Sequence, residues 1–306
     1  MRTLIFAAGV LAFIVAPAMA QTSSSNPAPP TQQASPQQAP SQKEPPKEMM
    51  EHWQRATVSL GLKAGDKYTT LGSAVVVAVD EHHGCLLTAR HMVDEPKRNW
   101  KPAEIQMRLA RGPTGSQDDL GVTIPLIVNN VSVWKAIEGT DLAVLPLPSG
   151  LNKYGDLHAV GIQDFGLTED DVFQGAPVLV LGYPGVIGEA PLSFPIARSG
   201  IVAWTDPTDR LHKPFLVDAN LMPGNSGGPV FHIRNGFNRY GTFVLGGGLA
   251  LIGIVSMVAE QDYKVPLQTP AGPAGVLQLQ IRGLGGIGVI EPALQAKQLV
   301  DENCGP

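Results

Sequence analysis

Basic clusters and metal-binding clusters are missing from this sequence. Only 16% of its 306 residues are charged, the formal net charge is −5, and the densest basic stretch is the short run 97–101. Because a nucleic-acid-binding domain usually carries a basic patch, we expect no nucleic-acid partner. His82 and His83 stand together, but no set of ligands at the spacing of a zinc site surrounds them, so we expect no metal site.

Long apolar runs are missing as well, except at the N-terminus. There, Arg2 precedes an almost wholly apolar stretch from Leu4 to Ala16, and an A-x-A cleavage site ends the pattern at residues 18–20. This is typical of a signal peptide over residues 1–20. The apolar stretch is too short for a comfortable membrane span, although an uncleaved anchor remains the alternative. We therefore expect an exported bacterial protein, periplasmic or secreted, with no stable membrane insertion after cleavage.

Composition divides the rest of the chain into two parts. Residues 21–48 are mainly Pro, Gln, Ser and Ala, and they have too few large apolar side chains to fold, so we expect a disordered linker. Residues 49–306 are expected to form the folded domain. The chain is 43% hydrophobic with 34 glycines and 27 prolines, which favours strands and turns over long helices. Short β-branched runs between turn residues agree with this, at 74–79, 122–128, 178–181 and 251–255.

One stretch, residues 223–230, has the sequence Pro-Gly-Asn-Ser-Gly-Gly-Pro-Val. Glycines allow a positive φ and the close approach of other atoms, so Ser226 can point its hydroxyl into open space. The backbone amides of Gly224 and Ser226 can turn to the same side, which is the geometry that an oxyanion hole requires. For this stretch taken alone, a simple surface turn is the alternative interpretation.

Two further stretches supply the groups that a serine nucleophile needs. A serine hydroxyl attacks only when a base takes its proton, and the base needs a carboxylate to orient it. His91 follows one apolar, strand-like run, and Asp141 directly precedes another. Asp118 and Asp119 are rival candidates for the carboxylate. We prefer Asp141 because it abuts the apolar run, as a buried orienting aspartate should.

The chain order His91, Asp141, Ser226 is the order of chymotrypsin-type enzymes. The blocks around these residues resemble the active-site blocks of trypsin-like serine proteases, with the strongest likeness to the bacterial Deg/HtrA-like branch. The resemblance runs from about residue 56 to about residue 302. It rests on the three blocks at 88–93, 140–145 and 223–230, and on further stretches in register at 178–185, 199–202, 218–220 and 286–290.

The resemblance implies an all-β fold with two antiparallel β-barrels of the six-stranded type. The first barrel would span about residues 56–150, and the second about residues 172–290. A short helix over about 292–302 would close the trypsin-like domain, which we place at 49–306. PDZ domains commonly follow this point in Deg/HtrA proteins. The few residues after the helix lead us to expect a protease without one.

The resemblance also implies an exported serine endopeptidase that cleaves proteins or peptides through an acyl-enzyme intermediate. Ser226 would be the nucleophile, His91 the base and Asp141 its orienting carboxylate, with no metal or organic cofactor. Asn220, six residues before the serine, would form the floor of the substrate pocket, and the strand around Ser256 would form a wall. Two alternatives remain: a catalytically silent trypsin-like fold that acts as a binding module, and an esterase or acyltransferase. No oligomeric state is predicted.

The sequence has two cysteines, Cys85 and Cys304. In an exported chain they can form a disulfide, which would join the start of the strand before His91 to the end of the C-terminal helix. The alternative is that both remain thiols, with Cys85 buried and Cys304 in a frayed tail.

Overall fold

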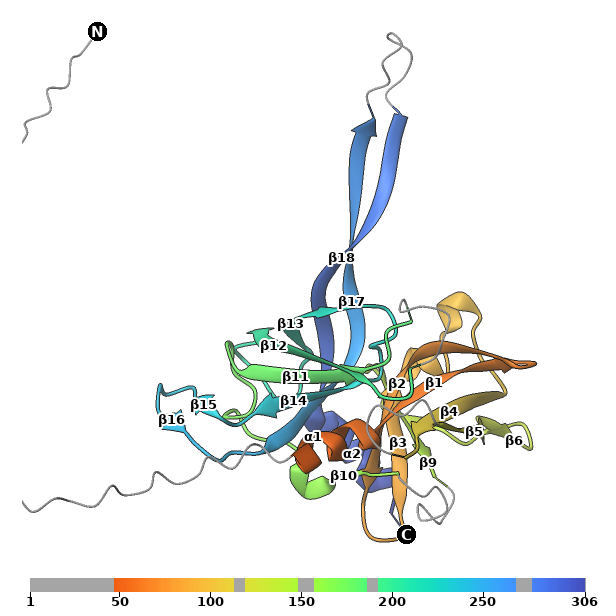
Figure 1. Ribbon diagram of the computed structural model, residues 1–306, viewed down its shortest axis with the longest axis horizontal. Helices are drawn as coiled ribbons and strands as arrows, with labels where there is room; N and C mark the ends of the chain where they lie inside the picture. The colour runs from red at the N-terminus through yellow and green to blue at the C-terminus, as the bar shows by residue number, and fades with distance from the viewer. Residues whose placement is uncertain (1–46, 113–118, 148–156, 186–191, 268–276, 306) are drawn as a thin grey trace, which may run out of the picture. The chain divides into compact units, whose positions relative to one another are not determined.

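The computed structural model describes residues 47–112, 119–147, 157–185, 192–267 and 277–305 (Figure 1). Within these ranges, residues 47–49 and 259–285 are described by their backbone alone. The predicted signal peptide and nearly all of the predicted linker lie outside the described residues. No helix within them is long and apolar enough to cross a membrane.

The first half of the domain is a mainly antiparallel sheet of eight strands in the order β5-β4-β1-β2-β3-β9-β8, with β10 paired in parallel to β2. Among the described residues this order does not close into a ring, so the expected six-stranded barrel is not found here. The edge strand β8 has only two residues, and β9 is its one partner among the described strands. The strands are β1 (Thr57–Ala64), β2 (Lys67–Ala78), β3 (Gly84–Ala89), β4 (Glu104–Ala110), β5 (Asp119–Pro125), β8 (Lys135–Ala136), β9 (Leu142–Pro146) and β10 (Val160–Gly161).

The second half is a closed barrel of six strands in the order β11-β12-β13-β18-β17-β14, as the resemblance implied. All neighbouring strands that are hydrogen-bonded in it run antiparallel. The mostly β fold with a short C-terminal helix is therefore confirmed. The strands are β11 (Pro177–Gly182), β12 (Ile196–Trp204), β13 (Phe215–Leu221), β14 (Pro229–Ile233), β17 (Leu249–Leu267) and β18 (Leu277–Pro292).

Short elements connect these strands. Two small hairpins pair β6 with β7 and β15 with β16. Single 3-10 turns follow β3 and β10 and lie in the loop before β4. The elements are β6 (Ile127–Val128), β7 (Val131–Ser132), β15 (Gly236–Phe237), β16 (Phe243–Val244), η1 (Arg90–Met92), η2 (Pro96–Arg98) and η4 (Ile162–Asp164).

The burial pattern of each strand follows from its side chains. In β13, Phe215, Val217, Ala219 and Leu221 are buried and alternate with more exposed residues, as in a strand with one face on a core. Strand β3 is buried at all six positions, because both of its faces are covered. One hydrophobic cluster fills each half. A third cluster joins the halves to the C-terminal helix through residues such as Leu87, Phe231 and Leu299.

Two helices pack on this framework. Helix α2 (Ala293–Asn303) lies within one residue of the predicted helix, and Ala293, Ala296 and Val300 are buried on one face as expected. Helix α1 (Lys47–Ala56) was not predicted, and it begins two residues inside the segment assigned to the linker. It forms because Trp53, only 6% exposed, packs on the core with its ring 4.8 Å from that of Phe231.

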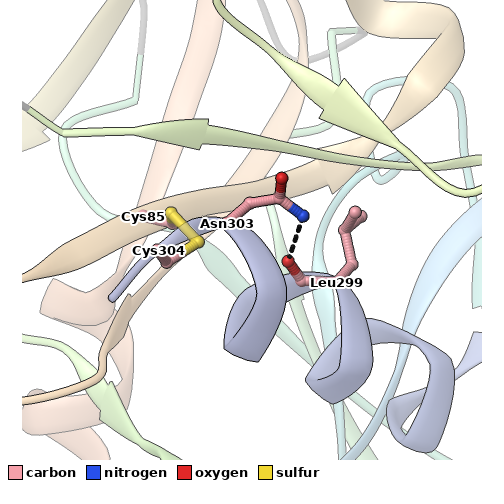
Figure 2. The surroundings of a disulfide bond; sticks show 4 residues. All are labelled: Cys85, Leu299, Asn303 and Cys304. Carbon is pink, nitrogen blue, oxygen red and sulfur yellow. Dashed lines mark hydrogen bonds between the residues drawn. A yellow bond between two sulfur atoms is a disulfide. The ribbon is translucent and has the colours of Figure 1, made fainter. Parts of the chain in front are cut away.

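A disulfide joins Cys85 of β3 to Cys304, the residue directly after α2, with the two Cα atoms 5.8 Å apart (Figure 2). Both cysteines are buried. The last turn of α2 is also closed by a hydrogen bond from the Asn303 amide to the Leu299 carbonyl, at 2.9 Å. The bridge therefore holds the C-terminal helix to the strand that leads to His91.

The longest strands, β17 and β18, continue past the barrel as a hairpin (Figure 1). Short strands were expected at residues 251–255 and 286–290 only. The structure instead extends the antiparallel pairing as far as Leu267 and Leu277. Pro266 lies in this extension, and a proline lowers the strand signal in a sequence because it lacks an amide donor.

Candidate active site

His91 and Asp141 lie side by side at the ends of two neighbouring strands of the first sheet. His91 is in the turn η1 after β3, and Asp141 directly precedes β9, which pairs with β3. The His91 Nδ1 atom is 2.8 Å from Asp141 Oδ2, and the His91 backbone amide donates to Oδ1 at 2.9 Å. Both oxygens of the carboxylate are therefore aligned on one histidine, as an orienting carboxylate requires.

The Asp141 carboxylate is stabilised in its ionised form. Burial opposes ionisation, but the hydrogen bonds from His91 and Ser256 outweigh it and hold the pKa of Asp141 below its usual value. The Ser256 hydroxyl donates to Asp141 Oδ2 at 2.6 Å. Ser256 was expected only as a wall of the substrate pocket, and this contact with the carboxylate was not predicted.

Ser226 lies in the turn between β13 and β14. Its hydroxyl donates to the Ser256 carbonyl at 3.2 Å. Among the described residues it has no hydrogen bond to His91. Ser256 thus contacts both Ser226 and Asp141, and it links the turn of the barrel to the carboxylate of the first sheet.

Two glycines in this turn have conformations that other residues adopt only with strain. Gly224 has φ +98° and Gly227 has φ +80°. A Cβ on Gly224 would lie 2.5 Å from the Tyr183 carbonyl oxygen, and one on Gly227 would lie 2.0 Å from the Ser73 carbonyl oxygen. The turn can pack against both halves of the domain only because these positions lack side chains.

The same turn leaves two amides without an acceptor. The amides of Asn225, Gly227 and Gly228 donate to backbone carbonyls. Those of Gly224 and Ser226 have no acceptor within the described part of the chain. They are the two donors that the sequence placed in an oxyanion hole, and donors of this kind stabilise a developing negative charge without reorganisation.

Ser73 of β2 fixes this turn from the first sheet, a role that was not predicted from the sequence. Its hydroxyl donates to the Gly224 carbonyl at 2.8 Å and accepts from the Tyr183 amide at 2.9 Å. Its own amide donates to the Ser226 carbonyl at 2.8 Å. The orientation of the peptide next to Gly224 therefore depends on a side chain 151 residues away along the chain.

Glu291, at the end of β18, is a second carboxyl beside Asp141 that the sequence did not reveal. Its Oε1 atom accepts the Asp141 backbone amide at 3.1 Å, and the residue is only 6% exposed. Burial raises the pKa of Glu291 above its usual value. Its Oε2 atom has no hydrogen-bond partner among the described residues.

The rival carboxylates lie elsewhere. Asp119 is in β5, where it forms an ion pair with Arg108 of β4. Asp118 lies outside the described residues. Asp141 is therefore the candidate that the structure brings next to His91.

Asn220, the expected pocket floor, is exposed at the end of β13 and has φ +51°. It lies beside Gly286 of β18, where an added Cβ would be 3.5 Å from the Asn220 Cα. The guanidinium of Arg198 donates to the Asn220 carbonyl at 2.9 Å. A positive charge therefore lies next to this position.

The fold is that of a known class. The model of the trypsin-like peptidase domain family matches residues 72–237, more than half of the chain, so the chain belongs to this family. The match includes His91, Asp141 and Ser226. The family resemblance predicted from the sequence is thereby confirmed.

Solved structures similar to the chain include the HtrA-type protease AlgW with a decapeptide and the same protease with a tripeptide. The first has 19% sequence identity, a TM-score of 0.47, and coverage of 83% of this chain and 66% of that one. The second has 21% identity, a TM-score of 0.45, and coverage of 83% and 62%. The chain thus spans less than two thirds of the length of these proteases. No curated protein matches it.

Proposed function

We propose that the protein is a serine endopeptidase in which Ser226, His91 and Asp141 act as one catalytic unit. The observation that carries the proposal is the pair of hydrogen bonds between His91 and both oxygens of Asp141, next to a turn that presents Ser226. The amides of Gly224 and Ser226, which have no acceptor among the described residues, support the same function.

The reaction follows from these positions. Ser226 Oγ attacks the carbonyl carbon of the scissile bond, and its proton passes to His91 Nε2. His91 then donates this proton to the leaving amine, which leaves an acyl group on Ser226. A water molecule, deprotonated by His91, attacks the acyl carbon. The bond to Ser226 Oγ then breaks, His91 returns the proton to this oxygen, and the acid is released. The amides of Gly224 and Ser226 would hold the oxyanion in both steps, and the loss of one such donor typically costs about 3–4 kcal/mol in the barrier.

A catalytically silent binding module is the second candidate, and one contact favours it. The Ser226 hydroxyl donates to the Ser256 carbonyl instead of to His91. In the proposed protease this hydroxyl turns toward His91 when a substrate binds, since catalytic hydrogen bonds are often long or poorly aligned before substrate is present. In a silent module it would stay on Ser256.

A serine-directed fluorophosphonate probe separates the two candidates. The proposed protease becomes covalently labelled on Ser226, and the variants Ser226→Ala and His91→Ala do not. Absence of labelling in the folded chain would favour the silent module. Comparison of peptide and ester turnover then separates an endopeptidase from an esterase or acyltransferase on the same site.

The location of the protein belongs to the same proposal. The signal-peptide pattern at residues 1–20 and the disulfide between Cys85 and Cys304 support export to an oxidising compartment, periplasmic or extracellular. The N-terminal sequence of the protein recovered from its native compartment tests this. A mature chain that begins at Gln21 is expected, and an intact N-terminus would contradict it.

A further inference from the structure

Large apolar side chains lie exposed on the small hairpin of β15 and β16, which lies between β14 and β17 in the chain. The hairpin projects from the barrel on the side away from the first sheet (Figure 1). Four of its side chains, each between 57% and 81% exposed, are called the apolar tip here: Phe237, Tyr240, Phe243 and Leu245. Side chains of this kind are usually buried, so a cluster of them on a surface indicates a binding site.

Pairing across the hairpin brings these side chains together. Phe237 lies directly opposite Phe243 in the ladder, and their rings are 5.2 Å apart. Side chains that are directly opposite in an antiparallel pair point to the same face, and so do residues two positions apart in a strand. Val244 is less exposed than Phe243 before it and Leu245 after it, as this alternation requires. The apolar tip is therefore one continuous surface.

The turn of this hairpin is fixed by Asn238. Its amide donates to the Thr242 carbonyl at 2.9 Å, and its side-chain oxygen accepts the amides of Tyr240 and Thr242 at 3.0 and 2.9 Å. The Gly241 amide donates to the Asn238 carbonyl at 2.9 Å, and Gly241 has the positive φ of the turn, +77°. The apolar tip is thus ordered before a partner binds, so binding loses little conformational entropy.

The hairpin carries two arginines, and carboxylates of the same chain neutralise both. The Arg234 guanidinium donates to Asp171 at 2.7 Å. The Arg239 guanidinium donates to Glu169 at 2.6 Å and pairs with Asp170 at 2.8 Å. These pairs hold the hairpin against the loop before β11. No other Lys or Arg lies within residues 234–245, so the hairpin has no unpaired cation that would attract an anionic surface.

The area of the apolar tip argues against a second copy of the chain as its partner. At about 200 Å² for a fully exposed side chain of this size, the four side chains expose roughly 550 Å². A stable interface between two proteins needs about 800 Å² on each side. The apolar tip is too small for that.

Its composition suits the interface of a lipid bilayer. Aromatic side chains are enriched at the depth of the lipid headgroups, where one end of the side chain is in contact with apolar groups and the other with polar groups. The Tyr240 hydroxyl has such a polar contact, since it accepts a hydrogen bond from Arg239 at 2.5 Å. A lipid interface also needs no concave surface that matches the projecting hairpin.

We propose that the apolar tip binds the interface of a lipid bilayer, through apolar contact and without a requirement for anionic lipid. The contact is peripheral, because β15 and β16 have two residues each and a strand that crosses a bilayer needs about nine to eleven. Affinity follows from the apolar area that leaves water. The proposal does not depend on the proposed protease function, and it adds a place of action, the membrane surface.

Co-sedimentation with phosphatidylcholine vesicles tests the proposal. The mature chain that begins at Gln21 is used, so that the apolar stretch at residues 4–16 does not contribute. This parent chain should bind. The double variant Phe237→Ser, Phe243→Ser should lower the partition coefficient about ten-fold or more, since two large apolar side chains are lost. Phosphatidylglycerol in the vesicles, or added salt, should change the partition coefficient of the parent by about two-fold or less, because no unpaired cation takes part.

A second short hairpin supplies a matched control. Val128 of β6 and Val131 of β7 are exposed and lie opposite each other, as Phe237 and Phe243 do. The double variant Val128→Ser, Val131→Ser also removes two exposed apolar side chains, and it should bind vesicles as the parent does. Both double variants should keep the circular dichroism spectrum of the parent, because exposed side chains contribute little to folding stability.

Quenching by brominated lipid locates the contact without the loss of an apolar side chain. Phosphatidylcholine with bromine in its acyl chains should quench the added tryptophan of Phe243→Trp. It should not quench that of Val131→Trp. The parent chain gives the quenching of the tryptophans that all three proteins share.

Three results would overturn the proposal. The first is a parent chain that does not bind phosphatidylcholine vesicles. If that chain is also oligomeric by light scattering and the Phe237→Ser, Phe243→Ser variant is monomeric, the apolar tip binds a second copy of the chain. The second result is equal binding by the parent and this variant, with no quenching in Phe243→Trp. The third is binding that requires anionic lipid and is lost in salt, which would show that charge holds the protein on the membrane.

Discussion

Replacing Glu291 tests whether a second buried carboxyl holds Asp141 in place. Glu291 accepts the Asp141 amide, while the Asp141 side chain aligns His91, so Glu291 acts on His91 through Asp141. Glu291→Gln keeps an oxygen acceptor of nearly the same shape and removes the charge. Glu291→Leu has a similar volume and removes the acceptor.

The expected magnitude follows from the buried amide. A buried donor left without an acceptor costs about 1–3 kcal/mol. If misalignment of Asp141 and His91 adds the whole of this free energy to the activation barrier, kcat falls by roughly 5- to 150-fold. We expect this fall in Glu291→Leu, with little change in KM because Glu291 has no predicted contact with substrate. Glu291→Gln should keep kcat within a few-fold of the parent chain.

The pH dependence of stability gives an independent measurement. Because burial raises the pKa of Glu291, the folded chain binds its proton more tightly than the unfolded chain does. The stability that the Glu291 carboxyl contributes is therefore present below its pKa in the unfolded chain. It is lost as the pH rises through its pKa in the folded chain. The Tm of Glu291→Gln should rise relative to the Tm of the parent chain as the pH rises from about 4 to neutrality.

Peptide hydrolysis and thermal unfolding of the three proteins check this reasoning. The reasoning is refuted if Glu291→Leu has the kcat of the parent chain. It is also refuted if Glu291→Gln and Glu291→Leu lose activity equally, or if the Tm difference for Glu291→Gln does not change with pH. An equal loss would show that the charge matters and the acceptor does not.

Three further predictions concern the disulfide, Asp141 and the pocket. The bridge closes a loop of 219 residues, for which chain entropy predicts a stabilisation of about 5 kcal/mol. Replacing Cys85 and Cys304 with Ala should therefore lower the Tm strongly. Two titratable thiols in the unreduced, denatured chain would contradict the bridge. Because the pKa of Asp141 is lowered in the folded chain, the stability that its carboxylate contributes is lost as the pH falls through that folded pKa. Thermal unfolding should therefore show a smaller destabilisation by Asp141→Asn in acid than at neutral pH. A difference in Tm that does not depend on pH would refute this. Asn220 is neutral and lies beside Arg198, so a buried Lys or Arg of the substrate would find no opposite charge there. A peptide library should therefore be cleaved mainly after small or medium apolar residues. Dominant cleavage after Arg or Lys would refute this assignment.

The sequence predicted the local parts of the site. His91 and Asp141 each adjoin a short buried strand, and apolar runs of this kind are visible in a sequence. The turn of Ser226 could be predicted because a backbone with positive φ that lies close to other atoms requires glycine. The closed barrel and helix α2 followed from the family resemblance.

The parts that were missed depend on contacts between distant residues. Glu291 reaches Asp141 across 150 positions of the chain, and Ser73 reaches Gly224 across 151. No periodicity marks a single polar residue that is satisfied only in the folded chain. The hairpin of β17 and β18 was missed because Pro266 lowers the strand signal. Helix α1 was missed because the segment is short and few of its side chains, among them Trp53 and Ala56, are buried in the core.

The central claim is that Ser226 and His91 act on one chemical step. Hydrolysis of casein by the parent chain, Ser226→Ala, His91→Ala and the double variant tests it most directly. If the claim holds, each single variant loses nearly all turnover, and the double variant is little worse than either, because groups that act as a unit are strongly non-additive. Parent-level hydrolysis by Ser226→Ala, or losses that multiply in the double variant, would contradict the claim.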